Sequence, residues 1–254
     1  EVMHPRIGPA QEGGTLYVEG LDLRERARRA KEFCVWDVGM GAASNALVVM
    51  RALRDLPVRL HVWSFDVTAD ALRFAIRHAA EFDLLGDLLP MAAEVLDQGF
   101  AEFTGGRAHI RWEYCEGEFL EQSAGRPSPQ AVCFDPWSPR KNPGMWTLAV
   151  FRHLYSCLDP ELPCSLATYS RATCIRSALL LAGFHVGIGP GIGAKEESTI
   201  AATDPALLAN PLPASWLQKA ERSHSGRPLY SDRFTQAPVG GEMLEQLRRH
   251  PQFR

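Results

Sequence analysis

A short apolar run that ends in a glycine-rich turn is the feature that most constrains the fold of this chain. Residues 33–38 have the length and composition of a buried strand, and Gly39 and Gly41 follow them directly. Residues 42–56 then repeat apolar positions at helical spacing and stop before Pro57. This order predicts the first half of a βαβ unit, in which the glycine turn lets the backbone approach a ligand closely.

The alternation of strand and helix patterns continues along most of the chain. Further strands are predicted at residues 60–65, 109–114, 131–134, 164–169, 184–188 and 197–202. Helices are predicted at residues 69–85, 90–103, 145–158, 172–182, 214–221 and 241–249. Only a short glycine-rich stretch joins the last two strands, which favours an antiparallel hairpin. We therefore predict a Rossmann-like α/β fold with a seven-stranded, mostly parallel sheet and one antiparallel strand.

The same patterns divide the chain into three parts. A length of 254 residues suits one large α/β domain better than two. We place this domain at residues 33–204, after an N-terminal segment at residues 1–32. Residues 205–254 are proline-rich and irregular, and we interpret them as a C-terminal appendage.

Composition excludes several classes of protein. Hydrophobic residues make up 46% of the chain and charged residues 22%, as in ordinary globular proteins. No apolar run approaches the roughly 18–20 residues that span a bilayer, and the first residues lack the order of a signal peptide. The six cysteines are scattered without a Cys-x-x-Cys pair, which favours reduced core thiols over a disulfide framework or a metal site. We expect a cytoplasmic protein with neither a metal nor a membrane partner, of unknown oligomeric state.

Two acidic residues flank the glycine turn and indicate the ligand. Asp66 ends the next strand, where a carboxylate accepts the ribose hydroxyls of an adenosine ligand. These features suit either a nicotinamide cofactor or S-adenosylmethionine. Ser44 stands where the dinucleotide fingerprint needs a third glycine, and Asp37 would repel a pyrophosphate but attract a sulfonium. S-adenosylmethionine is therefore the favoured cofactor.

Two further segments carry candidate site residues. Glu116 and Glu118 follow the strand at residues 109–114, where an acidic side chain accepts from an adenine amino group or simply forms an exposed turn. Asp135 begins a proline-rich loop at the carboxyl end of a buried strand, near the expected switch point of the sheet. Trp137 and Trp146 in this loop offer flat surfaces for stacking a base, although packing inside the protein would also explain them.

The loop at residues 135–147 reads Asp-Pro-Trp-Ser-Pro-Arg-Lys-Asn-Pro-Gly-Met-Trp-Thr. It resembles the signature loop of the MnmC-type methyltransferases, which complete 5-methylaminomethyl-2-thiouridine at the tRNA wobble position. The resemblance extends over residues 33–203 and includes residues 35–47, 167–170, 181–186 and 193–197. It implies a Rossmann-like class I methyltransferase that uses S-adenosylmethionine and acts on the anticodon region of tRNA. The chain is too short for a flavin-dependent oxidase half, so the resemblance implies a stand-alone methyltransferase.

The resemblance also assigns roles to residues of this sequence. Asp135 lies beside the transferred methyl and the acceptor amine and is the catalytic candidate. The implied cofactor-binding residues are Asp37, Gly39, Met40, Gly41, Asn45, Asp66, Glu118 and Asp135. The implied substrate-binding residues are Trp137, Pro139, Lys141, Trp146 and Tyr169.

Three positions depart from bifunctional members of the family. Ala42-Ala43-Ser44 replaces a common Thr-Gly-Leu, which puts the backbone contacts of the cofactor loop in doubt. Glu118 replaces an Asp and so lengthens the acidic arm. Asp-Pro-Trp at residues 135–137 replaces Asp-Gly-Phe, which reshapes the acceptor pocket.

Charge bears on the acceptor. The net charge of −3 gives no overall attraction to nucleic acid. Basic residues in the loop and the C-terminal stretch are nevertheless candidate phosphate contacts, namely Arg140, Lys141, Lys219, Arg222, Arg227 and Arg233. Two alternatives stay open at this point: a methyltransferase for a small-molecule amine or another acceptor, and a binding protein with a degenerate cofactor site.

Overall fold

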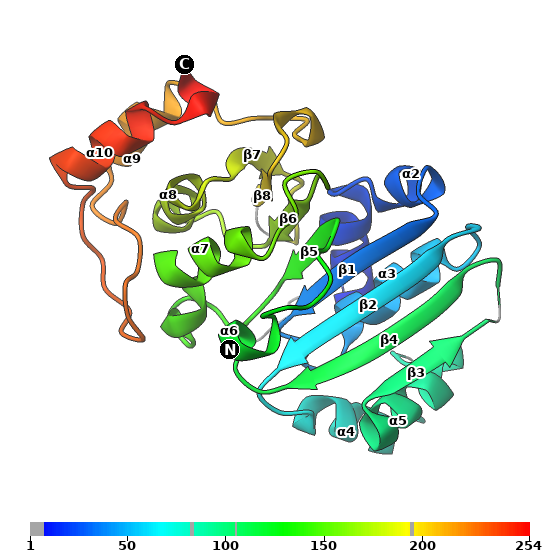
Figure 1. Ribbon diagram of the computed structural model, residues 1–254. Helices are drawn as coiled ribbons and strands as arrows, with labels where there is room; N and C mark the ends of the chain where they lie inside the picture. The colour runs from blue at the N-terminus through cyan, green and yellow to red at the C-terminus, as the bar shows by residue number, and fades with distance from the viewer. Residues whose placement is uncertain (1–7, 82–83, 105, 194–195) are drawn as a thin grey trace.

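One mixed sheet organises the described part of the chain, which in the computed structural model comprises residues 8–81, 84–104, 106–193 and 196–254. Eight strands in these residues follow the order β3-β4-β2-β1-β5-β6-β8-β7 (Figure 1). Their bounds are β1 Glu32–Val38, β2 Arg59–Asp66, β3 Phe100–Phe103, β4 His109–Glu116, β5 Ala131–Phe134, β6 Ser165–Thr168, β7 His185–Gly189 and β8 Ser198–Ala202. The chain moves outward from β1 in both directions, which places the switch point of the sheet between β1 and β5.

Strand directions confirm the predicted fold class. Strands β4, β2, β1, β5 and β6 are parallel to one another, and β8 is antiparallel to both β6 and β7. Strands β7 and β8 thus form the predicted antiparallel pair. Strands β1 and β5 are almost wholly buried, as expected for the centre of a parallel sheet covered on both faces.

An eighth strand, β3, corrects the sequence analysis. The predicted helix at residues 90–103 ends early, because α5 (Leu89–Gln98) terminates at Gly99 in the left-handed conformation with φ 81°. The chain then turns back, and Phe100–Phe103 pairs antiparallel with β4 at the sheet edge. The predicted helix at residues 69–85 is also shorter, since α4 covers Asp70–Arg77; residues 82 and 83 of that prediction lie outside the described residues.

Helices cover the sheet from two sides (Figure 1). One apolar core lies between the sheet and α3 (Ser44–Leu53), α4 and α5. The N-terminal elements pack into the same core, namely α1 (Pro9–Gly13), the π-helical η1 (Gly14–Glu19) and α2 (Leu23–Arg28). The second core lies under α6 (Phe119–Gln122), α7 (Leu148–Ser156) and α8 (Thr173–Ala182).

The C-terminal residues belong to the second core. Helices α9 (Trp216–Arg222) and α10 (Gly241–Arg248) contact each other, and Trp216, Leu229 and Leu247 are buried against the core beneath α7 and α8. Short 3₁₀ turns complete the described elements: η2 Gly86–Leu88, η3 Pro143–Trp146, η4 Pro205–Leu207 and η5 Pro251–Phe253. Residues 8–32 and 205–254 therefore pack against the two cores of the sheet, and the domain boundaries at residues 32 and 204 stay a prediction.

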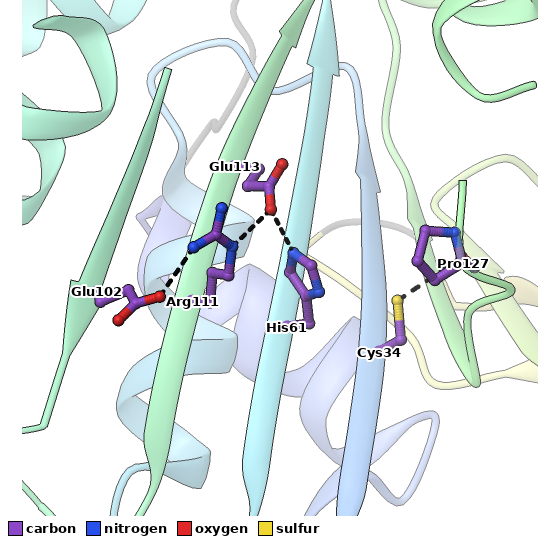
Figure 2. Close-up of polar contacts among 6 residues, drawn as sticks. All are labelled: Cys34, His61, Glu102, Arg111, Glu113 and Pro127. Atoms are coloured by element: carbon purple, nitrogen blue, oxygen red, sulfur yellow. Dashed lines mark hydrogen bonds and ion pairs between the residues drawn. The ribbon is translucent and has the colours of Figure 1, made fainter. Parts of the chain in front are cut away.

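Part of one sheet face carries polar side chains instead of a helix. In Figure 2, Arg111 lies between Glu102 on β3 and Glu113 on β4, with N–O distances of 2.8 and 2.6 Å. His61 on β2 contacts the same Glu113 oxygen at 3.0 Å. Partial burial lowers the pKa of His61, and the neighbouring Glu113 opposes this effect. The network lies towards the amino ends of β2 and β4, away from the edge where ligands bind in such sheets.

No helix in the described residues is both long and apolar enough to cross a membrane. The same described residues contain no cluster of three or more His, Cys, Asp or Glu side chains that could hold a metal ion.

Candidate active site

The carboxyl ends of four neighbouring strands bring the predicted acidic residues to one edge of the sheet. In spatial order, β4 leads to Glu118, β2 ends at Asp66, β1 leads to the glycine turn, and β5 leads to Asp135. Neighbouring strands lie about 4.8 Å apart, so the row from β4 to β5 spans about 14 Å. Glu118 is exposed and Asp66 is half-buried. The row therefore places carboxylates along the sheet edge at the switch point, where sheets of this kind bind ligands.

The two glycines of the turn serve different purposes. Gly39 has φ +87°, and a Cβ there would lie 2.7 Å from the carbonyl oxygen of Asp135 and the Cα of Pro136. It is required by the protein's own packing. Gly41 has φ +53°, no atom lies within 4 Å of the corresponding Cβ position, and its N–H donates to Asp66 Oδ2 at 2.9 Å. The open space at Gly41 lies on the side where a ligand can approach.

Two neighbours of these glycines behave differently from the prediction. The Met40 side chain is 2% exposed and packs in the core, so only its backbone is available to a ligand. Ala43 adopts φ +64° at the N-cap of α3. A left-handed conformation is strained for alanine by about 1–2 kcal/mol. A glycine would adopt this conformation without that cost.

Asp37 is a buried carboxylate with one unsatisfied oxygen. Ser64 Oγ donates to Asp37 Oδ2 at 2.9 Å, and Trp112 Nε1 donates to Ser64 Oγ at 2.9 Å. Asp37 Oδ1 has no hydrogen-bond partner among the described residues. Burial raises the pKa of Asp37 to about 7, the Ser64 hydrogen bond opposes this, and the charges of Asp135 and Asp66 add to it. This end of β1 is therefore poised to accept a positive charge.

Tyr17, to which the sequence alone assigns no definite role, lies near the two carboxylates of the candidate site. It lies on η1, which contacts both α3 and β6, and it is 1% exposed. Its hydroxyl has no partner in the described part of the chain. Burial and the charges of Asp135 and Asp37, among others, raise the pKa of Tyr17 well above its usual value. The N-terminal segment thus contributes a hydroxyl to the neighbourhood of the two carboxylates, and no motif around Tyr17 indicates this.

Asn45 and Asp135 are brought together as the predicted cofactor site requires. Asn45 lies in the first turn of α3 and is 8% exposed. Its Nδ2 donates to Asp135 Oδ2 at 2.9 Å, and the Asp135 N–H donates to Val38 O at 2.9 Å. The carboxylate at the end of β5 is therefore held in place by the helix that follows the glycine turn.

The loop after Asp135 is fixed by aromatic packing. Trp146 is fully buried, lies 5.2 Å from the Phe134 ring and 5.7 Å from the Tyr169 ring, and donates from Nε1 to Trp137 O at 2.8 Å. Its predicted contact with a substrate base is corrected here, because a buried indole shapes the loop from within. Tyr169 donates to Pro136 O at 3.3 Å. Trp137 itself is 52% exposed and free to stack on a ligand.

The remaining predicted contacts lie around this loop and along the C-terminal segment. Pro139 is half-buried and Lys141 is exposed. The guanidinium groups of Arg140 and Arg227 lie 5.3 Å from the rings of Phe234 and Tyr230, respectively. The other predicted phosphate contacts are exposed, with Lys219 and Arg222 on α9 and Arg233 beyond it.

Comparison with known proteins identifies this arrangement. Residues 102–204 match the family described as S-adenosyl-L-methionine-dependent methyltransferase. The tRNA 5-methylaminomethyl-2-thiouridine biosynthesis bifunctional protein MnmC of Burkholderia vietnamiensis is 30% identical over 209 residues, which cover 77% of this chain and 31% of that protein. The protein of the same name from Cupriavidus necator is 27% identical over 86% of this chain and 35% of its own length. The chain thus spans about a third of the length of these relatives.

A solved structure supports the fold independently. MNMC2 from Aquifex aeolicus superposes with a TM-score of 0.69 at 23% identity, covering 96% of this chain and 77% of that one. Within the matched segment at residues 193–197, Ala194 and Lys195 lie outside the described residues.

Three features of the structure fit the cofactor of this family: the open space beside Gly41, the unpartnered Asp37 oxygen and the unpartnered Tyr17 hydroxyl. A carboxylate-lined edge with these features suits a cationic adenosyl ligand better than a pyrophosphate. With the sequence relationship and the shared fold, they settle the choice between the cofactors considered above. The chain is an S-adenosyl-L-methionine-dependent methyltransferase, and over most of its length it is similar to proteins of the MnmC type.

Proposed function

We propose that this chain methylates the amino group of 5-aminomethyl-(2-thio)uridine at the wobble position of tRNA, forming 5-methylaminomethyl-(2-thio)uridine. The names of the relatives support this acceptor. The observation that carries the proposal is the Asp135 carboxylate, held by Asn45 beside the glycine turn. We expect the reaction to take place in the cytoplasm.

The row of carboxylates assigns a part of the cofactor to each residue. Asp66 would accept the ribose hydroxyls, because each of its oxygens uses one lone pair for a backbone N–H and keeps another. Glu118 would accept from the adenine amino group. Asp37 and Tyr17 would bind the amino-acid end and balance its charge. Bound in this way, S-adenosylmethionine supplies an electrophilic methyl group on a positively charged sulfur.

Asp135 would act on the acceptor amine. The amine must be neutral to attack, and it gains a positive charge as the new N–C bond forms. A carboxylate that accepts a hydrogen bond from the amine stabilises this charge and takes up the proton that the product releases. Asn45 holds the carboxylate in one orientation, so alignment of the reacting atoms contributes to the rate.

The loop would position the uridine. The exposed indole of Trp137 offers a stacking surface next to Asp135, and Tyr169 holds the backbone between them by donating to Pro136 O. Pro139 and Lys141 lie in the same loop and complete the proposed acceptor site. Trp146 is left out of the direct contacts because of its burial.

Replacing Asp135 tests the proposal. We expect Asp135→Ala to lower turnover on tRNA bearing 5-aminomethyluridine by at least about a hundredfold, as for a general base or key polar group. Calorimetry with S-adenosylmethionine should show largely intact cofactor binding. Asp97→Ala, on the exposed face of α5, provides the matched control. Near-normal turnover of Asp135→Ala would remove this residue from the mechanism.

Identification of the product tests the acceptor itself. Nucleoside mass spectrometry of tRNA from cells lacking this protein should show 5-aminomethyl-(2-thio)uridine accumulating in place of the methylated nucleoside. The alternative, a small-molecule amine acceptor, predicts unchanged tRNA and activity on free amines. Unchanged wobble nucleosides would therefore refute the tRNA assignment while leaving the methyltransferase fold intact.

A further inference from the structure

A pocket of about 520 Å³ opens between the start of α8 and helix α9, away from the row of acidic residues. It brings together segments more than forty positions apart in the sequence. Its lining consists of Thr173, Ser215, Gln218, Lys219, Arg222 and Ser223.

The chemistry of this lining is that of an anion site. Two side chains are cations, three are hydroxyls and one is an amide, and the lining includes no carboxylate. Within the described residues, neither Lys219 nor Arg222 has an ion-pair partner, and the adjacent Glu221 faces Arg248 at 3.4 Å instead. Uncompensated cations beside several hydrogen-bond donors favour an oxyanion such as phosphate.

The end of α8 adds to this preference. Thr173 is the first residue of this ten-residue helix, and no side chain caps the helix at that end. Unsatisfied N–H groups and the helix dipole give such an end a partial positive charge. The lining cations and the helix end therefore act in the same direction.

The position of the pocket relates it to the acceptor site. Tyr169, which contacts the loop after Asp135, precedes Thr173 by four residues. A chain of four residues reaches at most about 14 Å. An anion in the pocket would lie within a few nucleotides of a base held at Trp137.

We propose that this pocket binds a backbone phosphate of the tRNA, close to the nucleotide that is methylated. The inference rests on the proposed function, since it names how the same substrate is held. The acidic edge of the sheet repels phosphates, so a separate basic pocket is needed to bring a polyanion to it. The bound phosphate would fix the position of the strand while the base reaches Asp135.

The double variant Lys219→Gln/Arg222→Gln tests this. We expect the KM for tRNA to rise roughly tenfold at moderate salt, with kcat at saturating tRNA and cofactor affinity unchanged. Loss of this phosphate contact should also reduce the slope of log affinity against log salt by about 1. The control double variant Lys31→Gln/Arg107→Gln removes the same amount of charge near the amino ends of β1 and β4. It should leave KM, kcat, cofactor affinity and the salt slope unchanged.

Conservative replacement separates charge from packing. With Arg222 unchanged, the single variant Lys219→Arg should retain wild-type tRNA affinity, whereas Lys219→Gln should not. If the pocket double variant and the control double variant weaken tRNA binding equally, or if neither weakens it, the pocket has no specific role and the inference is overturned. If inorganic phosphate stabilises the wild type against heat while the pocket variant keeps a normal KM for tRNA, the site takes a free ion and the inference is also overturned.

The same data distinguish the two levels of the argument. Wild-type protein that neither binds nor methylates tRNA would refute the proposed function, and the inference with it. Wild-type protein that methylates tRNA normally, alongside an unaffected pocket variant, would refute the inference alone.

Discussion

Asp37→Asn should make the ligand-free protein more stable at alkaline pH and a poorer binder of its cofactor. Asp37 is fully buried, its Oδ2 accepts from Ser64, and its Oδ1 has no partner in the described residues. Burial raises its pKa from the ordinary 3.8 to about 7. Between pH 3.8 and about pH 7, the folded protein therefore keeps a proton on Asp37 that the unfolded chain has released.

The sign and size of the effect follow from this difference. Stability falls as the pH rises through the window from about 4 to about 7, by about 1.4 kcal/mol for each pH unit, and is then constant. The full cost of ionising Asp37 in the folded state is about 4 kcal/mol. Asparagine has no ionisation cost. If its buried N–H group lacks a hydrogen-bond acceptor, however, the gain in unfolding free energy is smaller by about 1–3 kcal/mol.

The measurement is the difference in unfolding free energy between variant and wild type as a function of pH. Denaturant unfolding from pH 5 to 8.5 should show the difference growing in favour of Asp37→Asn up to about pH 7 and constant beyond it. Comparing the two proteins cancels the other titrating groups. Ser64→Ala is the control, because it removes the hydrogen bond to Asp37 and keeps the carboxylate.

Cofactor binding provides the second half of the experiment. A carboxylate near a cationic ligand contributes about 1–4 kcal/mol to the binding free energy. The variant Asp37→Asn should therefore bind S-adenosylmethionine at least about tenfold more weakly. Calorimetry at pH 8 in buffers of different ionisation enthalpy measures both the affinity and the protons exchanged. A stability difference that does not vary with pH, together with unchanged affinity, would refute the reasoning about Asp37.

Three further predictions concern the backbone, the hydroxyl and the C-terminus. Gly39→Ala should lower the unfolding free energy by at least about 2 kcal/mol, because the backbone there has φ +87° and the added Cβ would lie 2.7 Å from other atoms. Ala43→Gly should raise the unfolding free energy by about 0.5–1 kcal/mol, because it relieves the left-handed alanine. Denaturant unfolding measures both changes. Tyr17→Phe should retain the fold but raise the KM for S-adenosylmethionine more than it lowers kcat, with equal stability by calorimetry as the check. Burial, and to a lesser degree His185, lowers the pKa of His250 to about 4, so the stability that the neutral ring provides above pH 6.5 is lost as the pH falls towards 4. Amide protection factors at residues 241–254, corrected for the intrinsic exchange rate at each pH, should therefore be smaller at pH 5 than at pH 7. Equal protection factors at the two pH values would contradict the last prediction.

Local patterns account for most of the fold that the sequence predicted. The buried strands at β1 and β5 and the hairpin of β7 and β8 follow from apolar runs bounded by glycine or proline, and these signals act within a few residues. Strand β3 was missed because Phe100–Phe103 is short and lies at an edge, so its partner decides its conformation. Gly99 was the available signal, since glycine commonly ends a helix.

The site was predictable where residues follow strands and obscure where distant segments meet. The carboxyl ends of parallel strands meet at one edge, so Asp66 and Asp135 could be expected near the glycine turn. The Tyr17 hydroxyl reaches the site from a segment before the first strand, and only the packing of η1 against α3 and β6 reveals it. The burial of Trp146 likewise depends on tertiary contacts, with Phe134 and Tyr169.

Electrostatics explains why the cofactor and the nucleic acid would need separate sites. The carboxylates of Asp37, Asp66, Asp135 and Glu118 lie along one sheet edge, where they would attract a cationic cofactor and the proposed amine acceptor. The same charges would repel the nearby phosphates of the proposed tRNA substrate, and the net charge of −3 gives no overall attraction to a polyanion. Affinity for the polyanion must then come from local basic groups displaced from the reacting atoms, and the pocket of Lys219 and Arg222 is such a place. Neutralising the acidic edge would therefore strengthen tRNA binding while abolishing methylation. Neutralising the pocket would weaken tRNA binding and leave the rate of methyl transfer at saturating tRNA unchanged.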